Sequence, residues 1–423
     1  MSNYKEVVDS LKNIIFKGDD IQSICDLIIL GAVMGGASDI HIEPLSGFVR
    51  LRYRIDGDLR EILEYQSFLH GQIIARFKIM ADLKIDESRI PQDGRISKTI
   101  ENKPLDLRVS SLPTVHGEKL VMRIVDKSKK IPTLDDLGIV GKNLDLIKKG
   151  ISLPNGIVLT SGPTGSGKST TLYSCLTILN KEDVNIMTLE DPVENQVDGI
   201  NQSQVRPDIG YSFANGLRTA LRQDPDIIMV GEIRDKETVE IAIEASLTGH
   251  LVLSTIHTNS AAETLTRVIQ MGIQPFLIPA SFNIVIAQRL IRRLCSHCKK
   301  EISLNELDKN TLADIKNALS QTDKKELMDR VGAEKLKSPT LYTHVGCEHC
   351  DNTGYKGRVG LYEVLEITDG VKQMVLDGQS AFNINKQAIK DGMISLEQDG
   401  IMKALNGDTS IEEVYSVAKT QNG

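Results

Sequence analysis

One short segment constrains the fold of this chain more than any other feature: the octapeptide GPTGSGKS at residues 162–169. The apolar run GIVLT precedes it and the amphipathic segment TTLYSCLTILN follows it, so strand and helix flank the loop and disfavour a plain glycine turn. Glycines let backbone N–H groups wrap a phosphate, a lysine neutralises phosphate oxygens, and a hydroxyl can bind Mg²⁺. We predict a phosphate-binding loop formed by Gly162, Pro163, Thr164, Gly165, Ser166, Gly167, Lys168, Ser169 and Thr170, with Ser169 as a magnesium ligand.

Apolar runs alternate with helical patterns around this loop. The runs NIMTL, DIIMV and HLVLSTI are separated by the segments FANGLRTALRQ and TVEIAIEASLTG. Short buried runs between helices are typical of a mostly parallel sheet covered on both faces. We therefore predict a doubly wound α/β core over residues 141–294.

Polar residues follow the apolar runs of this core. Glu190 ends one run, Glu232 comes just after another, and His250 and His257 flank a third. Taken singly, each is explained by a solvated strand end or a capping residue. Ligands bind at the carboxyl ends of the strands in such sheets, so together with a phosphate loop these residues predict a magnesium ligand at Glu232 and a water-polarising carboxylate at Glu190.

The residues before the core have a different pattern. The segment FVRLRYRIDGDLREI reads as a β-hairpin turning at Asp56-Gly57, with Arg50, Arg52 and Arg54 on one face. A helical stretch and further strands follow, which predicts an α+β domain over residues 21–126. Residues 1–20 are expected to be a short N-terminal segment, and the polar residues 127–140 a linker.

Four of the six cysteines form two CxxC pairs, Cys295/Cys298 and Cys347/Cys350. Paired thiolates on tight turns suit tetrahedral Zn²⁺. A redox pair and unrelated buried cysteines are the alternatives, and Cys25 and Cys175 are expected in the core. The 48 residues between the pairs, 299–346, exceed the common spacing of a zinc ribbon, so we expect them to form a separate segment that leaves the metal site and returns to it. We predict a zinc-binding subdomain at 295–358 and a helical C-terminal region at 359–423.

The composition excludes some classes of partner. The 423-residue chain has a formal net charge of −7, 4% aromatic residues and no tryptophan, which disfavours nucleic-acid binding. Its longest apolar stretch, residues 24–36, is shorter than the about 20 residues that a membrane span requires. No secretory signal can be read at the N-terminus. We expect a cytoplasmic protein with no integral membrane segment and no nucleic-acid partner.

Several segments in order resemble the secretion ATPase superfamily, in particular the assembly ATPases of type IV pili and type II secretion (the GspE/PilB group). They are ASDIHIEP (37–44), RIPQDGRIS (89–97), GEKLVMRI (117–124), GPTGSGKSTTLY (162–173), LEDPVE (189–194), GLRTALRQDPDIIMVGEIRD (216–235), ASLTGHLVLSTIHTN (245–259) and AQRLIRRLC (287–295). The resemblance implies a RecA-like P-loop ATPase core preceded by a small PAS-like α+β domain. It also implies a homo-hexamer that uses ATP, Mg²⁺ and Zn²⁺, with each site completed by an adjacent subunit.

The resemblance carries roles to single residues of this chain. Glu232 would be the magnesium-side glutamate, Glu190 the acidic-box glutamate and general base, and His257 the histidine of the family's histidine box. The arginines around the phosphates would be Arg108, Arg123, Arg218, Arg222 and Arg358, with surface salt bridges as the alternative for each.

The resemblance also implies a partner, an inner-membrane platform protein at the cytoplasmic face of the membrane. Longer relatives carry a further N-terminal domain that docks there, and about 20 residues precede the α+β domain here, so we expect no cyclic-dinucleotide site. Pilus retraction ATPases resemble this core but generally lack the four cysteines, so the resemblance favours a role in pilus assembly over pilus retraction. A nucleic-acid or conjugative translocase and an ATP-binding scaffold without turnover are the alternative functions.

Overall fold

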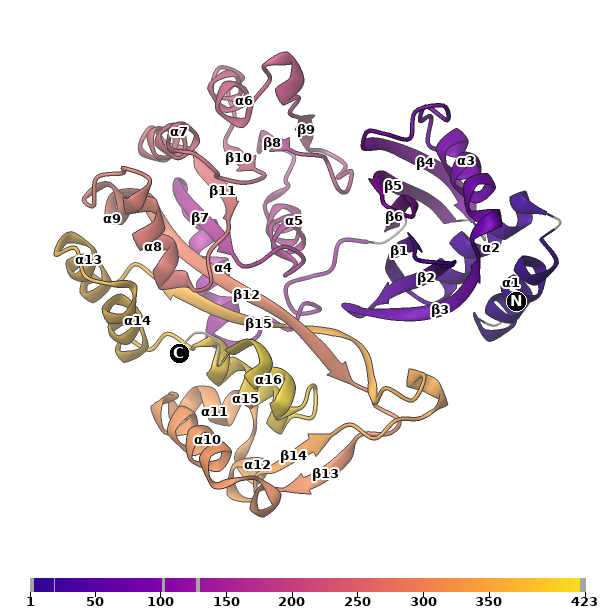
Figure 1. Ribbon diagram of the computed structural model, residues 1–423. Helices are drawn as coiled ribbons and strands as arrows, with labels where there is room; N and C mark the ends of the chain where they lie inside the picture. The colour runs from indigo at the N-terminus through magenta and orange to yellow at the C-terminus, as the bar shows by residue number, and fades with distance from the viewer. Residues whose placement is uncertain (1–3, 19, 101–102, 127–129, 419–423) are drawn as a thin grey trace. The chain divides into compact units, whose positions relative to one another are not determined.

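The computed structural model describes residues 4–18, 20–100, 103–126 and 130–418. The chain divides between residues 130 and 131 into two compact units, which we describe separately (Figure 1). In the described ranges, no helix combines the length and the apolar character needed to cross a membrane.

The N-terminal unit is a six-stranded antiparallel sheet whose strands run in the order β3-β2-β1-β6-β5-β4. Three helices and the inward side chains of the sheet share one apolar core. The elements are α1 (Tyr4–Lys17), α2 (Ile21–Met34), β1 (Ala37–Pro44), β2 (Phe48–Ile55), β3 (Asp58–Gln66), the 3₁₀ turn η1 (Ser67–Leu69), α3 (His70–Met80), β4 (Gln92–Ile100), β5 (Lys103–Thr114) and β6 (Gly117–Asp126).

The β2–β3 hairpin forms at the predicted turn. Asp56 and Gly57 both have positive φ, 51° and 98°, which is the conformation of the tight turns that match the twist of two strands. Exposure alternates along β2, so Arg50, Arg52 and Arg54 share the face opposite the apolar core. There Arg52 pairs with Glu43 of β1 at 2.8 Å. The outer face of this sheet is therefore charged, as the alternation indicated.

The start of the N-terminal unit and the later part of the expected linker differ from our expectation. Residues 4–17 form α1, and its Leu11 and Ile15 lie in the core of this unit, so the domain begins before residue 21. Residues 127–129 of the expected linker lie outside the described residues. Its later part is not a free linker, because Leu134 and Ile139 are buried in the core of the C-terminal unit.

The C-terminal unit contains a seven-stranded sheet in the order β15-β12-β7-β11-β10-β8-β9. All neighbours are parallel except β15, which runs antiparallel to β12, so the predicted mostly parallel sheet is confirmed. The strands are β7 (Gly156–Ser161), β8 (Ile186–Glu190), β9 (Asn201–Gln204), β10 (Ile227–Val230), β11 (Leu251–Ile256), β12 (Phe282–Leu294) and β15 (Tyr355–Glu366).

Helices cover both faces of this sheet. The helices α4 (Gly141–Ser152) and α5 (Lys168–Leu179) share one apolar cluster with Val158, Met229 and Leu253. The opposite face, with Ile157, Ile228 and Val252, packs in another cluster with α6 (Phe213–Ala220), α7 (Lys236–Leu247), α8 (Ala261–Gln270), α9 (Leu277–Ser281), α13 (Asp369–Leu376) and α14 (Ala381–Lys390). Alternate residues of one strand thus face opposite helix layers, as a doubly wound fold requires.

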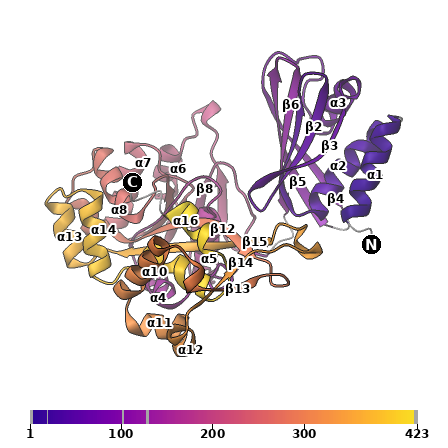
Figure 2. The same ribbon diagram turned by 60° about the horizontal axis from the view of Figure 1, so that its bottom comes forward.

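The expected helical region at 359–423 begins with a strand. Residues 359–366 belong to β15, which pairs with β12 from Ile284↔Glu366 to Arg292↔Arg358. Periodicity cannot distinguish a short, fully buried strand from a helix, because every position is apolar or covered. The remaining elements are β13 (Lys300–Ser303), α10 (Lys309–Gln321), α11 (Lys324–Arg330), α12 (Ala333–Lys337), β14 (Thr340–Thr343), α15 (Leu396–Leu405) and α16 (Ile411–Ala418), with short 3₁₀ turns between some of them (Figure 2).

A buried ionic cluster ties the insert to the C-terminal helices. Asp399 of α15 accepts hydrogen bonds from Arg330 at 2.5 Å and Lys403 at 2.7 Å, and from the backbone N–H of Tyr362 at 2.9 Å. Burial alone would raise the pKa of Asp399, but Lys403 and Arg330 bring it below its ordinary value. The carboxylate therefore holds two cations from two segments in the interior.

We expect Asp399→Ala to lower the free energy of unfolding by about 3–5 kcal/mol, because it removes the carboxylate paired with buried Lys403 and leaves Arg330 only Glu326 at 3.6 Å. Urea titration of the full chain measures the loss. Asp329→Ala, at an exposed position of α11, is the control and should change stability by no more than about 0.5 kcal/mol. Equal losses in the two variants would contradict the role assigned to Asp399.

Candidate functional site

The predicted phosphate loop leaves the end of β7 and closes at the start of α5. Gly162, Gly165 and Gly167 have φ values of 148°, 79° and 87°, a region that L side chains rarely adopt. A Cβ on Gly162 would lie 2.6 Å from the Gln288 carbonyl oxygen and 2.6 Å from Ser166 Oγ. Glycine is therefore required at Gly162 both by backbone conformation and by the strand beneath the loop.

The side chain of Lys168, at the start of α5, reaches back to the beginning of the phosphate loop. Its Nζ donates hydrogen bonds to the carbonyl oxygens of Gly162 at 2.8 Å and Pro163 at 3.1 Å. Burial lowers the pKa of Lys168, and the nearby charge of Glu232 acts in the opposite direction. The buried Ser166 Oγ has no hydrogen-bond partner within the described residues. A cation enclosed by a glycine loop at a helix N-terminus suits a phosphate group.

Glu232 and His257 come from neighbouring parallel strands. The strands β10 and β11 pair with Val230 opposite Ser254, so the loops that follow them leave the same edge of the sheet. His257 Nε2 lies 3.4 Å from Glu232 Oε2, and Glu232 also pairs with Arg234. The carboxylate contributes to the charge around Lys168. The structure therefore brings Lys168, Glu232 and His257 together at one edge.

Glu190, at the end of β8, is only 4% exposed. Its Oε1 accepts hydrogen bonds from Thr188 Oγ1 at 2.5 Å and Gln202 Nε2 at 3.1 Å, and its Oε2 accepts one from the Tyr173 hydroxyl. Three donors thus fix the orientation of this carboxylate. None of these donors was singled out by the sequence, because they come from α5, β8 and β9.

The predicted arginines fall on both units. Arg108 and Arg123 lie opposite each other on β5 and β6, and Arg123 also pairs with Asp39 at 2.9 Å. In the C-terminal unit, Arg218 pairs with Glu237 at 2.7 Å and Arg222 donates to the Arg218 carbonyl at 2.8 Å. A fifth, Arg358, lies on β15 opposite Arg292. Arg123 and Arg218 thus each form an ion pair within their own unit, which is the alternative that we gave for these arginines.

The four predicted cysteines form one cluster. Their sulfur atoms all lie within 4.8 Å of one another, with separations of 3.9 Å for Cys295–Cys347, 3.8 Å for Cys298–Cys350 and 3.7 Å for Cys347–Cys350. Four thiolates around a zinc ion at about 2.3 Å stand about 3.8 Å apart, so the cluster fits tetrahedral Zn²⁺.

The antiparallel pair β12–β15 explains why the two CxxC motifs meet across so long an insert. Cys295 directly follows β12, and β15 begins five residues after Cys350. The other two cysteines are buried in apolar cores, and burial raises the pKa of each thiol to about 12. Cys25 and Cys175 are therefore core residues, as predicted.

Gln288 is a contact of the phosphate loop that sequence analysis missed. Its Nε2 donates a hydrogen bond to the Ser166 carbonyl at 2.7 Å. A signal was present, because Gln288 directly follows the apolar run IVIA of β12 and lies in a strand whose positions are mostly buried. A buried polar residue in such a strand needs a partner, and here the partner is the loop.

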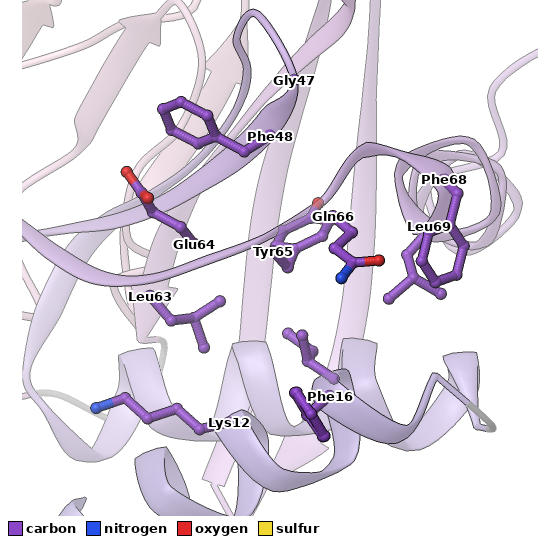
Figure 3. Close-up of a pocket in the computed structure, with 11 residues that line it drawn as sticks. Lys12, Phe16, Gly47, Phe48, Leu63, Glu64, Tyr65, Gln66, Phe68 and Leu69 are labelled. Atoms are coloured by element: carbon purple, nitrogen blue, oxygen red, sulfur yellow. The ribbon is translucent and has the colours of Figure 1, made fainter.

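A pocket of about 360 Å³ lies in the N-terminal unit, between α1 and the edge strand β3. Figure 3 shows Phe16, Phe48 and Phe68 around it, with Lys12 and Glu64. None of the site residues predicted from the sequence lines this pocket. The phosphate loop, not this pocket, is therefore the candidate for chemistry.

Comparison with known proteins agrees with this geometry. The family described as "Type II/IV secretion system protein" matches residues 17–416. The type IV pilus assembly ATPase PilB of Myxococcus xanthus is 47% identical over 97% of this chain and 70% of its own length. The type II secretion system ATPase E of Vibrio cholerae is 44% identical over 96% of this chain and 77% of its own length. The X-ray structure of the ATPase DotB of Legionella pneumophila shares the fold, with a TM-score of 0.65 at 22% identity over 93% of this chain and 95% of that one.

A phosphate loop on a doubly wound sheet, with acidic and histidine side chains at the same edge, defines a P-loop ATPase. The chain belongs to the type II/IV secretion system ATPase family.

We expect Cys347→Ser to abolish zinc binding, since three thiolates leave the tetrahedral site incomplete. Metal analysis of the purified full-length chain should find about one zinc per wild-type chain and almost none in the variant. Cys175→Ala, at a buried cysteine outside the cluster, should keep the metal. Full zinc content in Cys347→Ser would contradict a four-cysteine site.

Proposed function

We propose that this chain is the subunit of a cytoplasmic hexameric ATPase that drives assembly of a type IV pilus or a type II secretion pseudopilus. The observation that carries the proposal is the gathering of Lys168, Glu232 and His257 at one sheet edge, in a family of secretion ATPases. In this proposal the ring acts on an inner-membrane platform protein from the inner face of the cytoplasmic membrane. It has no nucleic-acid partner.

The proposed reaction is the hydrolysis of ATP to ADP and phosphate. Lys168 would neutralise charge on the β- and γ-phosphates, and Ser169 and Glu232 would hold Mg²⁺, which neutralises charge between the phosphate oxygens. Glu190 is the proposed general base for the attacking water. The three hydrogen bonds to its carboxylate support a role that depends on a fixed orientation.

The arginines supply the remaining positive charge in this proposal. Arg218, Arg222 and Arg358 would come from the subunit that binds ATP, and Arg108 and Arg123 from an N-terminal unit of an adjacent subunit. The neighbouring positions of Arg108 and Arg123 on one sheet face support a joint role. In other phosphoryl-transfer systems, an arginine supplied by another subunit raises kcat by about 10³–10⁵-fold.

The motor cycle in this proposal is the one that the family resemblance implies, and it uses a site shared between subunits. Binding of ATP would close the N-terminal unit of one subunit onto the core of another, and hydrolysis would release it. The four cysteines would hold a structural zinc ion at the far end of β12 and β15, where no step of hydrolysis involves it.

The central test is the rate of Mg-ATP hydrolysis as a function of protein concentration. If sites are shared, the activity per subunit should rise steeply with concentration. Lys168→Ala should abolish hydrolysis, and Glu232→Gln should lower it by about 10²-fold or more, because it removes a charge at the reacting phosphates. Wild-type turnover in Lys168→Ala would refute the phosphate-loop assignment.

Mixing two inactive variants tests whether Arg123 acts on ATP bound by an adjacent subunit. Lys168→Ala lacks a working phosphate loop but keeps Arg123, whereas Arg123→Ala keeps the loop but lacks the arginine. Because each variant then supplies what the other lacks, mixed rings should regain part of the wild-type rate. No recovery in mixed rings would mean that Arg123 does not act across a subunit boundary.

The alternative functions give different outcomes in the same assays. Stimulation of hydrolysis by DNA would favour a translocase. ATP binding without turnover, also after addition of the platform protein, would favour a scaffold that uses ATP only to hold the ring together.

A further inference from the structure

The strand β12 continues past the point where its neighbour β7 ends. The two strands pair as far as Ala287↔Ser161, and the phosphate loop leaves at Gly162. The next residue of β12, Gln288, therefore lies beside the loop instead of beside a strand. A Cβ on Gly162 would come within 2.6 Å of the Gln288 carbonyl oxygen, so the loop rests directly on the backbone of β12.

The side chain of Gln288 reaches the other end of the same loop. It is 1% exposed, and its Nε2 donates to the Ser166 carbonyl at 2.7 Å. A Cβ on Gly167 would lie 3.3 Å from that Nε2, so the amide is also in contact with the residue before Lys168. One residue of β12 thus touches both the beginning and the end of the loop.

Arg289 extends from the opposite face of the strand, because successive residues of a strand alternate. It is 8% exposed, and its Nη2 donates to the Asn259 carbonyl at 2.8 Å and contacts Asn259 Oδ1 at 3.3 Å. Asn259 lies two residues after His257. Arg289 therefore holds the backbone of the loop that carries the histidine.

Glu363 completes this arrangement from β15. It lies opposite Ala287, is 2% exposed, and accepts a hydrogen bond from the Ala261 N–H at 2.9 Å. Its charge and that of Arg289 act on each other. The loop from His257 to Ala261 is thus held by Arg289 near its middle and by Glu363 at its end.

We infer that Gln288 and Arg289 are positioning residues of the ATPase reaction: Gln288 sets the shape of the phosphate loop, and Arg289 sets the position of the His257 loop. This inference rests on the proposed function. The two loops come from β7 and β11, and consecutive residues of one strand reach both of them. A shift of β12 at this point would therefore move the two loops together.

Two conservative variants separate the two roles in the full-length chain. Gln288→Met keeps the volume but removes the donor to Ser166, so it should weaken ADP binding about fivefold in calorimetry. Arg289→Lys keeps the charge but loses the planar pair of donors, so it should lower kcat about tenfold while the Kd for ADP changes by less than about twofold. Arg293→Lys, exposed on the same strand, is the control and should match the wild type.

A mutant cycle tests whether Arg289 acts through the histidine loop. In a His257→Ala background, Arg289→Lys should lower kcat by no more than about twofold further, because the group it positions is gone. A further tenfold loss would overturn this part of the inference. If Arg289→Lys lowers the thermal unfolding midpoint, Glu363→Gln takes its place, since it removes the facing charge but keeps an oxygen for the Ala261 N–H.

The outcomes distinguish this inference from the proposed function. A wild-type chain without Mg-ATP hydrolysis, alone and with the platform protein, would remove the proposed function and this inference with it. If the wild type hydrolyses ATP and Lys168→Ala does not, but Gln288→Met and Arg289→Lys both keep wild-type kcat and Kd, the positioning roles alone are overturned.

Discussion

The parallel pairing of β7, β11, β10 and β8 is the constraint on which the nucleotide site depends. Parallel strands end at the same edge of a sheet, so the segments that follow them meet there without any further device. Lys168 follows β7, Glu232 follows β10 and His257 follows β11. The buried, apolar character of these short strands thus determines where polar chemistry can occur.

Local signals made much of the fold and of the candidate site predictable. The phosphate loop and the Asp56-Gly57 turn each depend on backbone conformations that few residue types adopt, so a few residues specify each of them. Contacts between distant segments were not predictable in this way. The strand character of β15 leaves no local pattern, because it depends on pairing with β12 far along the chain. The same holds for two of the three donors to Glu190, Tyr173 and Gln202, which lie on other elements.

The insert between the CxxC pairs was likewise predictable only in its local features. The cysteine spacing predicted the cluster, but not how residues 299–346 would pack. Ile315, Leu327 and Leu341 of the insert share an apolar core with α15 and α16. Glu326 also accepts hydrogen bonds from the backbone N–H of Lys142 at the start of α4. The insert is thus part of the C-terminal core and not an appendage held by metal alone.

The length of β12 has a structural consequence. Its first half is supported on both sides, by β7 and β15, whereas from Gln288 to Leu294 only β15 pairs with it. This second half is a ribbon about 20 Å long, at about 3.3 Å per residue, and it ends at the cysteine cluster. The C-terminal segment takes the place of the missing neighbour strand, because the Leu294 N–H donates to the Asp408 carbonyl at 2.9 Å and Arg292 pairs with Glu413 of α16 at 2.5 Å. One strand thus joins three parts that lie far apart in the sequence: the phosphate loop beside Gln288, the cysteine cluster after Leu294, and α16.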